Sequence, residues 1–196
     1  NEEGPRYGTS QCLDTGGAAG GTVLVVTGDS GVVNGTGTVR ARGADAALDP
    51  SQYHPTSSFA GGGGGRVELP QRGLTVDVRG GGGCQRGGAG TVFYRAKAEL
   101  DINNTLTTST AAITLLDVSV EPSNISTLTI ASGSVLSLQC SKCSAGEPIS
   151  VVTDSLVLRD HSELEVTHDI AAPKVSLASS SRLSAGGAAT AGRRLF

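Results

Sequence analysis

Three clusters of small residues, each followed at once by a short β-branched segment, limit the folds open to this chain. Gly61 to Gly65 lead into Arg66-Val67-Glu68-Leu69, and the cluster at 80–90 leads into Thr91-Val92-Phe93-Tyr94. A weaker copy at 16–21 leads into the segment that begins at Thr22. Aligned on Thr22, Arg66 and Thr91, the copies recur at about two periods and one period of roughly 20–25 residues, which is typical of a solenoid.

This recurrence predicts an all-β chain with the stacked coils of a parallel β-helix. A solenoid buries its apolar edge only by stacking one coil on the next. The expected strands are short, their turns are rich in Ser, Gly and Asp, and a two-strand unit recurs as an apolar run, an alternating run and glycines. A β-sandwich or jelly roll, with hairpin-linked strands of similar length, is the alternative.

The chain is expected to have three parts: an irregular segment at 1–15, glycine-rich coils at 16–105, and further coils with Ser/Thr-rich turns at 106–196. We expect it to be part of a longer chain. In 38–42, Val39 and Ala41 are predicted to face inward, and in 74–79 the alternation points Leu74, Val76 and Val78 inward. Short strands are predicted past residue 105, at 113–116, 118–120, 128–130, 135–138, 149–152, 156–158, 164–166 and 174–177.

Turn signals separate these later strands. Ser132-Gly133 and Asp160-His161-Ser162 are predicted turns. No stretch has a helical period, so we expect little helix.

The glycine runs are expected to form tight corners with positive φ, or places where the backbones of neighbouring coils approach closely. A flexible linker is one alternative. A phosphate-binding loop can be matched onto Gly80 to Gly90, but it requires a following helix, which the sequence does not predict.

Composition argues against several partners. Charged residues are 17% of the chain, the formal net charge is −3, and the longest basic block is Arg193-Arg194, so nucleic acid and anionic lipid are not expected partners. Aromatic residues are only 3%, which leaves little for a stacking platform that binds sugars or bases. No run approaches 18 apolar residues, so no membrane span is predicted in this segment, and no cofactor is expected.

Cysteines and glycosylation sequons indicate an extracellular, oxidising location. The favoured pairing is a local Cys140–Cys143 loop and a long Cys12–Cys84 tether, with other pairings left open. Cys140-Ser141-Lys142-Cys143 also has the spacing of a redox motif or of half a zinc site. N-glycans are predicted at three Asn-x-Ser/Thr sites: Asn34, Asn103 and Asn124.

Two further groups of residues have side chains that catalytic or metal sites use. His161 and His168 lie among acidic residues, and the preferred interpretation is a solvated face that alternates with core positions; His54 has no partner in the sequence. Asp77, Arg79, Asp117 and Glu121 could form a site for polysaccharide cleavage only if their coils stacked in register. We predict no catalytic residues, no metal site and no enzyme activity.

The strings GGGGGRV and GGAGTVFY resemble the glycine-rich repeats of large secreted or cell-surface proteins of algae and plants. The resemblance covers residues 15–105 and implies a right-handed parallel β-helix in a structural glycoprotein of a cell wall or ciliary surface, such as a mastigoneme filament. The predicted function is an extracellular scaffold that associates with itself or with other surface proteins. A polysaccharide-processing enzyme or a carbohydrate-binding module on the same fold is the alternative.

Overall fold

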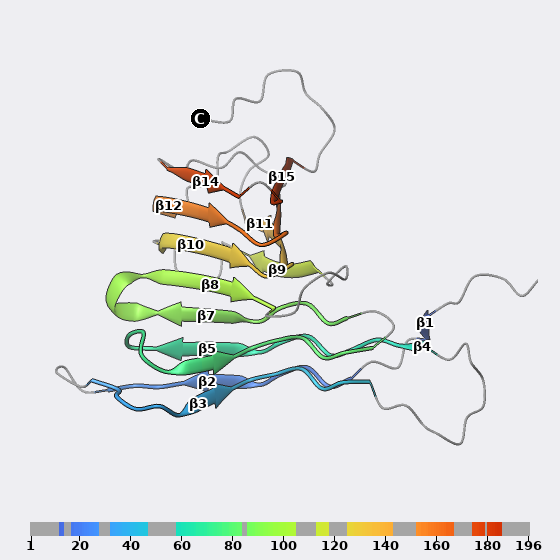
Figure 1. The fold of residues 1–196 in the computed structure, drawn as a ribbon, viewed down its shortest axis with the longest axis horizontal. Coiled ribbons are helices and arrows are strands. Elements are labelled where there is room, and N and C mark those ends of the chain that lie inside the picture. The colour runs from blue at the N-terminus through green and yellow to red at the C-terminus, as the bar shows by residue number, and fades with distance from the viewer. Residues whose placement is uncertain are drawn as a thin grey trace, which may run out of the picture.

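The structure, a computed structural model, shows an almost wholly β chain in its described part. It describes residues 12–13, 17–27, 32–46, 58–83, 86–104, 113–117, 125–142, 152–166, 174–178 and 180–185. Among these residues there is no α-helix, only one 3-10 turn, η1 (Arg95–Lys97). None of the described residues forms a helix long and apolar enough to span a membrane. The strands lie in layers, one above another (Figure 1).

Most strands belong to two sheets. The larger has seven strands in the order β14-β12-β10-β8-β7-β5-β2, and the smaller has four in the order β15-β13-β11-β9. All neighbours in both sheets are parallel except β7 and β8. The seven strands are β2 (Thr22–Leu24), β5 (Arg66–Leu69), β7 (Thr91–Tyr94), β8 (Glu99–Asn103), β10 (Ile125–Ala131), β12 (Val152–Leu158) and β14 (Val175–Leu177).

The remaining strands complete the layers. The smaller sheet contains β9 (Ile113–Asp117), β11 (Val135–Gln139), β13 (Glu163–Val166) and β15 (Arg182–Ala185). Two parallel pairs stand apart: β3 (Thr38–Arg40) with β6 (Thr75–Asp77), and β1 (Cys12–Leu13) with β4 (Ser58–Phe59). The prediction of an all-β, largely parallel chain is confirmed. Of the predicted later strands, 118–120 and most of 149–152 lie outside the described residues.

The register of the glycine-rich half agrees with the sequence alignment. Thr22 pairs with Arg66, and Arg66 pairs with Thr91. The predicted inward faces are also confirmed, since Ala41 and Val78 are buried and Leu74, Val76 and Val39 pack partly buried beside them. The repeated spacing in the sequence therefore corresponds to strands that are neighbours in the sheet.

At η1 the strand direction reverses. The chain turns through η1, with Ala98 in the left-handed region at φ 50°, so that β8 runs antiparallel to β7. The strands β2, β5 and β7 therefore run one way and β8, β10, β12 and β14 the other (Figure 1). A continuous stack of parallel coils would contain no such hairpin.

The hairpin also moves the hydrophobic core to the other face of the sheet. Paired residues of an antiparallel ladder share a face, and Tyr94, in the core of the first half, is paired with the charged Glu99. Phe93 is paired with Leu100, which belongs to the core of the second half. Thus the first core lies between one face and the β3–β6 pair, and the second lies between the opposite face and the four-stranded sheet.

The second half stacks equivalent residues from strand to strand. Leu128 pairs with Leu100 on one side and Leu156 on the other, and all three are buried. The predicted turns are present: Ser132 (φ 55°) and Gly133 (φ 67°) form one, and Asp160 (φ 56°) forms the next with His161. They are stacked, because the Gly133 N–H donates to the Asp160 carbonyl oxygen at 2.8 Å.

The glycine runs do not form the predicted corners with positive φ. Among the described glycines, positive φ occurs at Gly35, Gly73 and Gly133, and none of these lies in a run. The segments 17–21, 41–46, 60–65, 78–82 and 86–90 are instead hydrogen-bonded to one another as extended chains, which we call the glycine bundle. The flexible-linker alternative is therefore wrong for these segments, whereas the predicted close approach of backbones is present.

Several hydrogen-bond pairs between segments of the glycine bundle are spaced by three residues. Gly62 and Gly65 donate to Ala44 and Ala41, at 3.0 and 2.7 Å. Likewise Gly17 donates to Ala60, and three residues later Gly20 donates to Gly63 of the same partner segment at 2.8 Å. A three-residue period is that of a polyproline II chain, whereas a β-strand has a period of two. We therefore describe the bundle as packed polyproline II chains.

Candidate functional site

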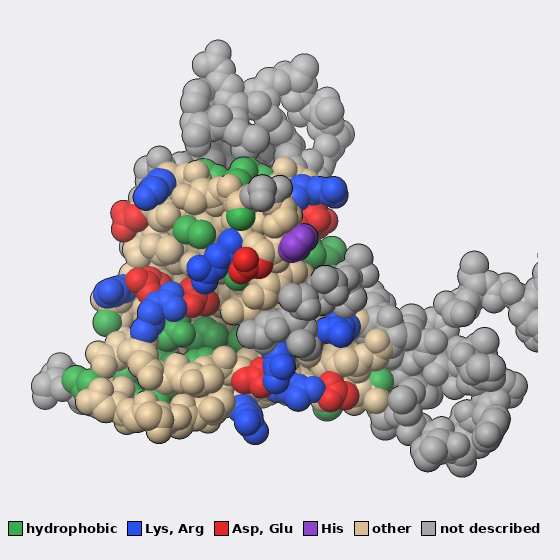
Figure 2. All heavy atoms as spheres, in the orientation of Figure 1, with side chains coloured by type: hydrophobic (Ala, Val, Ile, Leu, Met, Phe, Trp, Pro, Cys, Tyr) green, Lys and Arg blue, Asp and Glu red, His purple; other side chains and the backbone are tan. Residues whose placement is uncertain are grey.

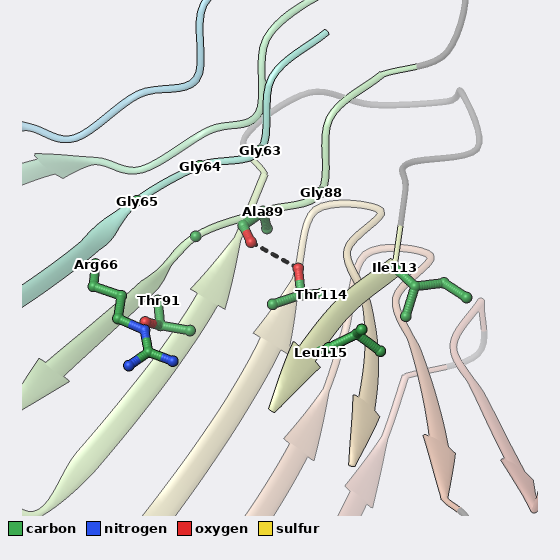
Figure 3. Close-up of a pocket in the computed structure, with 11 residues that line it drawn as sticks. Gly63, Gly64, Gly65, Arg66, Gly88, Ala89, Thr91, Ile113, Thr114 and Leu115 are labelled. Atoms are coloured by element: carbon green, nitrogen blue, oxygen red, sulfur yellow. Dashed lines mark hydrogen bonds between the residues drawn. The ribbon is translucent and has the colours of Figure 1, made fainter. Parts of the chain in front are cut away.

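A groove lies where the glycine bundle meets strand β9. Its volume is about 230 Å³, and segments 63–65 and 88–90 of the bundle form its floor. Ile113, Thr114 and Leu115 of β9 form the wall (Figure 3). The Thr114 hydroxyl donates to the Ala89 carbonyl oxygen at 2.7 Å, which attaches the wall to the floor.

The wall of the groove is apolar and open to solvent. Ile113 is 47% exposed and Leu115 is 62% exposed. β9 is an edge strand of the four-stranded sheet, so one side of its backbone is not paired within that sheet. Arg66 and Thr91 lie at the end of the groove where the glycine segments continue into β5 and β7 (Figure 3).

A charged network covers the junction of the two halves on the opposite face of the large sheet. Arg72 donates two hydrogen bonds to the Asp101 carboxylate, at 2.7 and 2.8 Å, and another to Glu99. The guanidinium carbon of Arg72 also lies 4.4 Å from the ring centre of Tyr94. Arg72 thus covers the last aromatic residue of the first core and neutralises the first carboxylates of β8.

Electrostatics at this junction follow from these contacts. Hydrogen bonding to Asp101 and Glu99 raises the pKa of Arg72, against the effect of burial. Burial raises the pKa of the Tyr94 hydroxyl, with a further contribution from the negative charge of Asp101. Side chains of both signs lie close together over this part of the surface (Figure 2).

Two further arginines, Arg42 and Arg79, bind carboxylates beside the glycine bundle. The Gly82 N–H, at 2.6 Å, and Arg42 hold the pKa of the exposed Asp45 carboxyl below its ordinary value. Arg79 donates to Asp77 at 2.7 and 2.8 Å and lowers the pKa of that carboxyl, which partial burial opposes. The Gly82–Asp45 hydrogen bond ties two segments of the bundle together, and the two arginines bind carboxylates two or three residues away.

The sequons differ in how far the fold exposes them. Asn34 is exposed, as is Thr36 two residues later. Asn103, at the end of β8, is only partly exposed, and the next residue, Asn104, is buried, with its side-chain oxygen accepting a hydrogen bond from the Gly80 N–H at 3.1 Å. Asn124 lies outside the described residues. The fold therefore presents Asn34 more openly than Asn103.

The structure describes the side chain of only one cysteine. Cys140 is disulfide-bonded and packs partly buried against the second core. The side chains of Cys12, Cys84 and Cys143 lie outside the described part of the chain. The pairings Cys140–Cys143 and Cys12–Cys84 therefore stay predictions.

Of the residues that could serve catalysis or metal binding, only Asp77 and Arg79 are joined by a contact within the described part of the chain. Asp77 is bound by Arg79, and Asp117 accepts a hydrogen bond from the Ser141 N–H at 3.3 Å. His161 is exposed in its turn, and Glu121, His54 and His168 lie outside the described residues. Within the described ranges, no three His, Cys, Asp or Glu side chains form a group suited to a metal ion.

Comparisons of this chain with protein-family models, with curated proteins and with solved structures found no match.

Sequence reasoning missed both the groove and the Arg72 network. The groove depends on how β9 lies against segments distant in sequence, which a local pattern does not specify. The Arg72 network had a partial signal, since Glu99 and Asp101 alternate with the apolar Leu100 and Ile102. That alternation predicts one charged face of β8, but it does not identify the arginine.

Proposed function

We propose that this chain is an extracellular structural module, a rigid N-glycosylated scaffold that associates with copies of itself or with other surface proteins in a filament, sheath or cell-surface layer. Its finer fold, in this proposal, is two short β-helical stacks joined through the β7–β8 hairpin. Right-handed coils follow from the general preference for right-handed crossovers between parallel strands.

The observation that carries the proposal is exposed apolar surface on both edge strands of the large sheet. On β14, Val175 is 40% exposed and Leu177 is 51% exposed, although they pair with Leu156 and Leu158 of the core. At the other edge, Leu24 of β2 is 56% exposed and Val26 beyond it is 68% exposed. Open edge strands with apolar side chains favour pairing with another chain.

Rigidity has a separate structural basis. Parallel ladders, stacked leucines and the glycine bundle give backbone hydrogen bonds along both halves of the molecule. The exposed Asn34 offers a place for a glycan on the flank of the first half, away from the edge strand β14. These features suit a load-bearing or surface-covering role better than a diffusible binding domain.

Electron microscopy of the protein purified from its natural source tests the proposal, together with sedimentation of the secreted recombinant chain over a range of concentrations. We expect elongated assemblies in the first and concentration-dependent growth in the second. Monodisperse particles of single chains in both measurements would contradict the proposal. Cleavage of acidic polysaccharides by those particles would then establish the enzyme alternative.

A further inference from the structure

We propose that the groove beside β9 binds an extended glycine-rich segment of a partner protein, which packs there as one more chain of the glycine bundle. The inference rests on the proposed function and deepens it, because it gives the chemistry of a lateral partner. The groove is separate from the edge strands β2 and β14. Peptide binding in the groove and association through the edge strands can therefore be tested independently.

The floor of the groove already has the packing that such a partner needs. Its two segments are bound to each other, since the Gly64 N–H donates to Gly88 at 2.9 Å and the Thr91 N–H donates to Gly65 at 3.0 Å. A methyl group added at Gly64 would overlap the Val78 carbonyl oxygen, so the chains of the bundle approach closely because they lack side chains. The groove therefore continues an interface that exists within the molecule.

Gly63 lines this groove, and no described residue and no backbone angle requires glycine there. A Cβ atom added at Gly63 meets no atom of the described residues within 4 Å, and its φ lies outside the range that favours glycine. Gly21 and Gly37 share this freedom, but they do not line the groove. Close approach of a second backbone is a physical reason for glycine at this position.

The size and the lining of the groove favour a glycine-rich partner. With a volume of about 230 Å³ and a floor of glycine segments, the groove leaves little room for bulky side chains between a bound backbone and the floor. The three-residue recurrence in the glycine bundle matches a polyproline II chain, which rises by about 3.1 Å per residue. An ordinary strand added to β9 is the competing mode, and its side chains would meet the floor.

Fluorescence anisotropy with a labelled peptide tests the inference on the full chain. The probe is Ala-Gly-Gly-Gly-Gly-Gly-Arg, the sequence of residues 60–66, and its control carries alanine in place of the three central glycines. The groove is blocked by Gly63→Leu, or more mildly by Gly63→Ala, and Gly37→Leu is the matched control at an open position outside the groove. Thermal unfolding of each variant verifies its fold.

We expect the glycine peptide to bind the wild-type chain and Gly37→Leu equally. Gly63→Leu should weaken binding by about tenfold or more, and the alanine peptide should not bind. No binding to the wild type at about 1 mM would overturn the inference, as would unchanged binding by folded Gly63→Leu. Equal binding of the two peptides would assign the site to an ordinary strand. Filament formation is measured separately, by electron microscopy and sedimentation. Failure of the groove to bind the peptide is therefore distinguishable from failure of the chain to assemble.

Discussion

Arg72 joins the two halves of the molecule through three side chains. Its guanidinium lies over Tyr94 of the first core and binds Glu99 and Asp101 of β8. Arg72 is half exposed, whereas the two carboxylates are less than a fifth exposed. Solvent therefore screens these ion pairs mainly through the exposed part of the arginine, because both carboxylates are largely covered.

Replacement of Arg72 by alanine should lower the free energy of unfolding by about 1–2 kcal/mol. Partly exposed ion pairs contribute about 0.2–1 kcal/mol each and the cation–π contact about 0.5–1 kcal/mol. Arg72→Lys should recover only part of this, because lysine lacks the planar fork that binds Asp101 in two places. Urea unfolding measures both values; a lysine variant as stable as wild type would show that charge alone suffices.

The glycine bundle predicts opposite effects for neighbouring substitutions. Gly64→Ala should cost about 3 kcal/mol, since the added methyl overlaps the Val78 carbonyl oxygen and the backbone must move. Gly63→Ala should be neutral or stabilise by about 0.4–1 kcal/mol, because it restricts only the unfolded chain. Urea unfolding of the two variants tests this, and equal losses would mean that the bundle is packed differently.

Asp77 should make stability depend on pH in acid. Arg79 holds the folded pKa of Asp77 below its ordinary value of 3.8, so its stabilisation is fully present above that value and is lost as the pH falls through the folded pKa. Asp77→Asn should therefore be less stable at pH 7, by up to about 1 kcal/mol. The difference from wild type should shrink below pH 3.8 in unfolding measured against pH; a constant difference would exclude this linkage.

At the scale of elements, the register of β2, β5 and β7 could be predicted because each glycine segment continues directly into its strand. Thr22, Arg66 and Thr91 therefore carry the alignment into the sheet. The β7–β8 hairpin could not be predicted from the sequence, because Arg95 to Ala98 contains no Gly, Asn or Asp turn signal. The alternation of apolar and polar residues in 91–103 is the same for parallel and antiparallel pairing. It therefore does not reveal that the core moves to the opposite face of the sheet between β7 and β8.

The three-residue period of the bundle was hidden for a related reason. Runs of one residue type have no internal pattern, so Gly61 to Gly65 are compatible with corners, linkers and packed extended chains alike. The distinction arises from which backbones lie beside them. Likewise, the position of Arg72 over Tyr94 depends on how the connection between β5 and β6 lies beside the β7–β8 hairpin.

The stacked leucines of the second half predict how stability is distributed among its strands. Leu128→Ala on β10 should cost about 2–5 kcal/mol, because Leu128 is fully buried between Leu100 and Leu156 and truncation leaves a cavity. Leu115→Ala on β9, with 62% exposure, should change stability by less than about 0.5 kcal/mol. Thermal and urea unfolding compare them; similar small losses would mean that the core is loosely packed.

At the scale of the whole molecule, the hairpin decides how copies can meet. The edge strands β2 and β14 run in opposite directions and have different sequences, so pairing β2 of one copy with β14 of another is a head-to-tail contact. Such contacts do not close on themselves unless the rotation between copies completes a ring, and otherwise they extend into a filament. Contact between two β14 strands would instead give a closed dimer.

Introducing a charge at an exposed leucine of either edge strand distinguishes these assemblies. Leu24→Lys and Leu177→Lys should each prevent growth, because each adds a charge to one side of the head-to-tail contact. A mixture of the two variants should form dimers that grow no further. In such a dimer the intact β14 of Leu24→Lys pairs with the intact β2 of Leu177→Lys, and both remaining edges carry a lysine. Ala96→Lys, which adds the same charge at an exposed position of η1 away from both edges and from the groove, should assemble as wild type does. Sedimentation velocity measures all four samples. Dimers in Leu24→Lys alone would indicate β14–β14 contacts and contradict the head-to-tail arrangement.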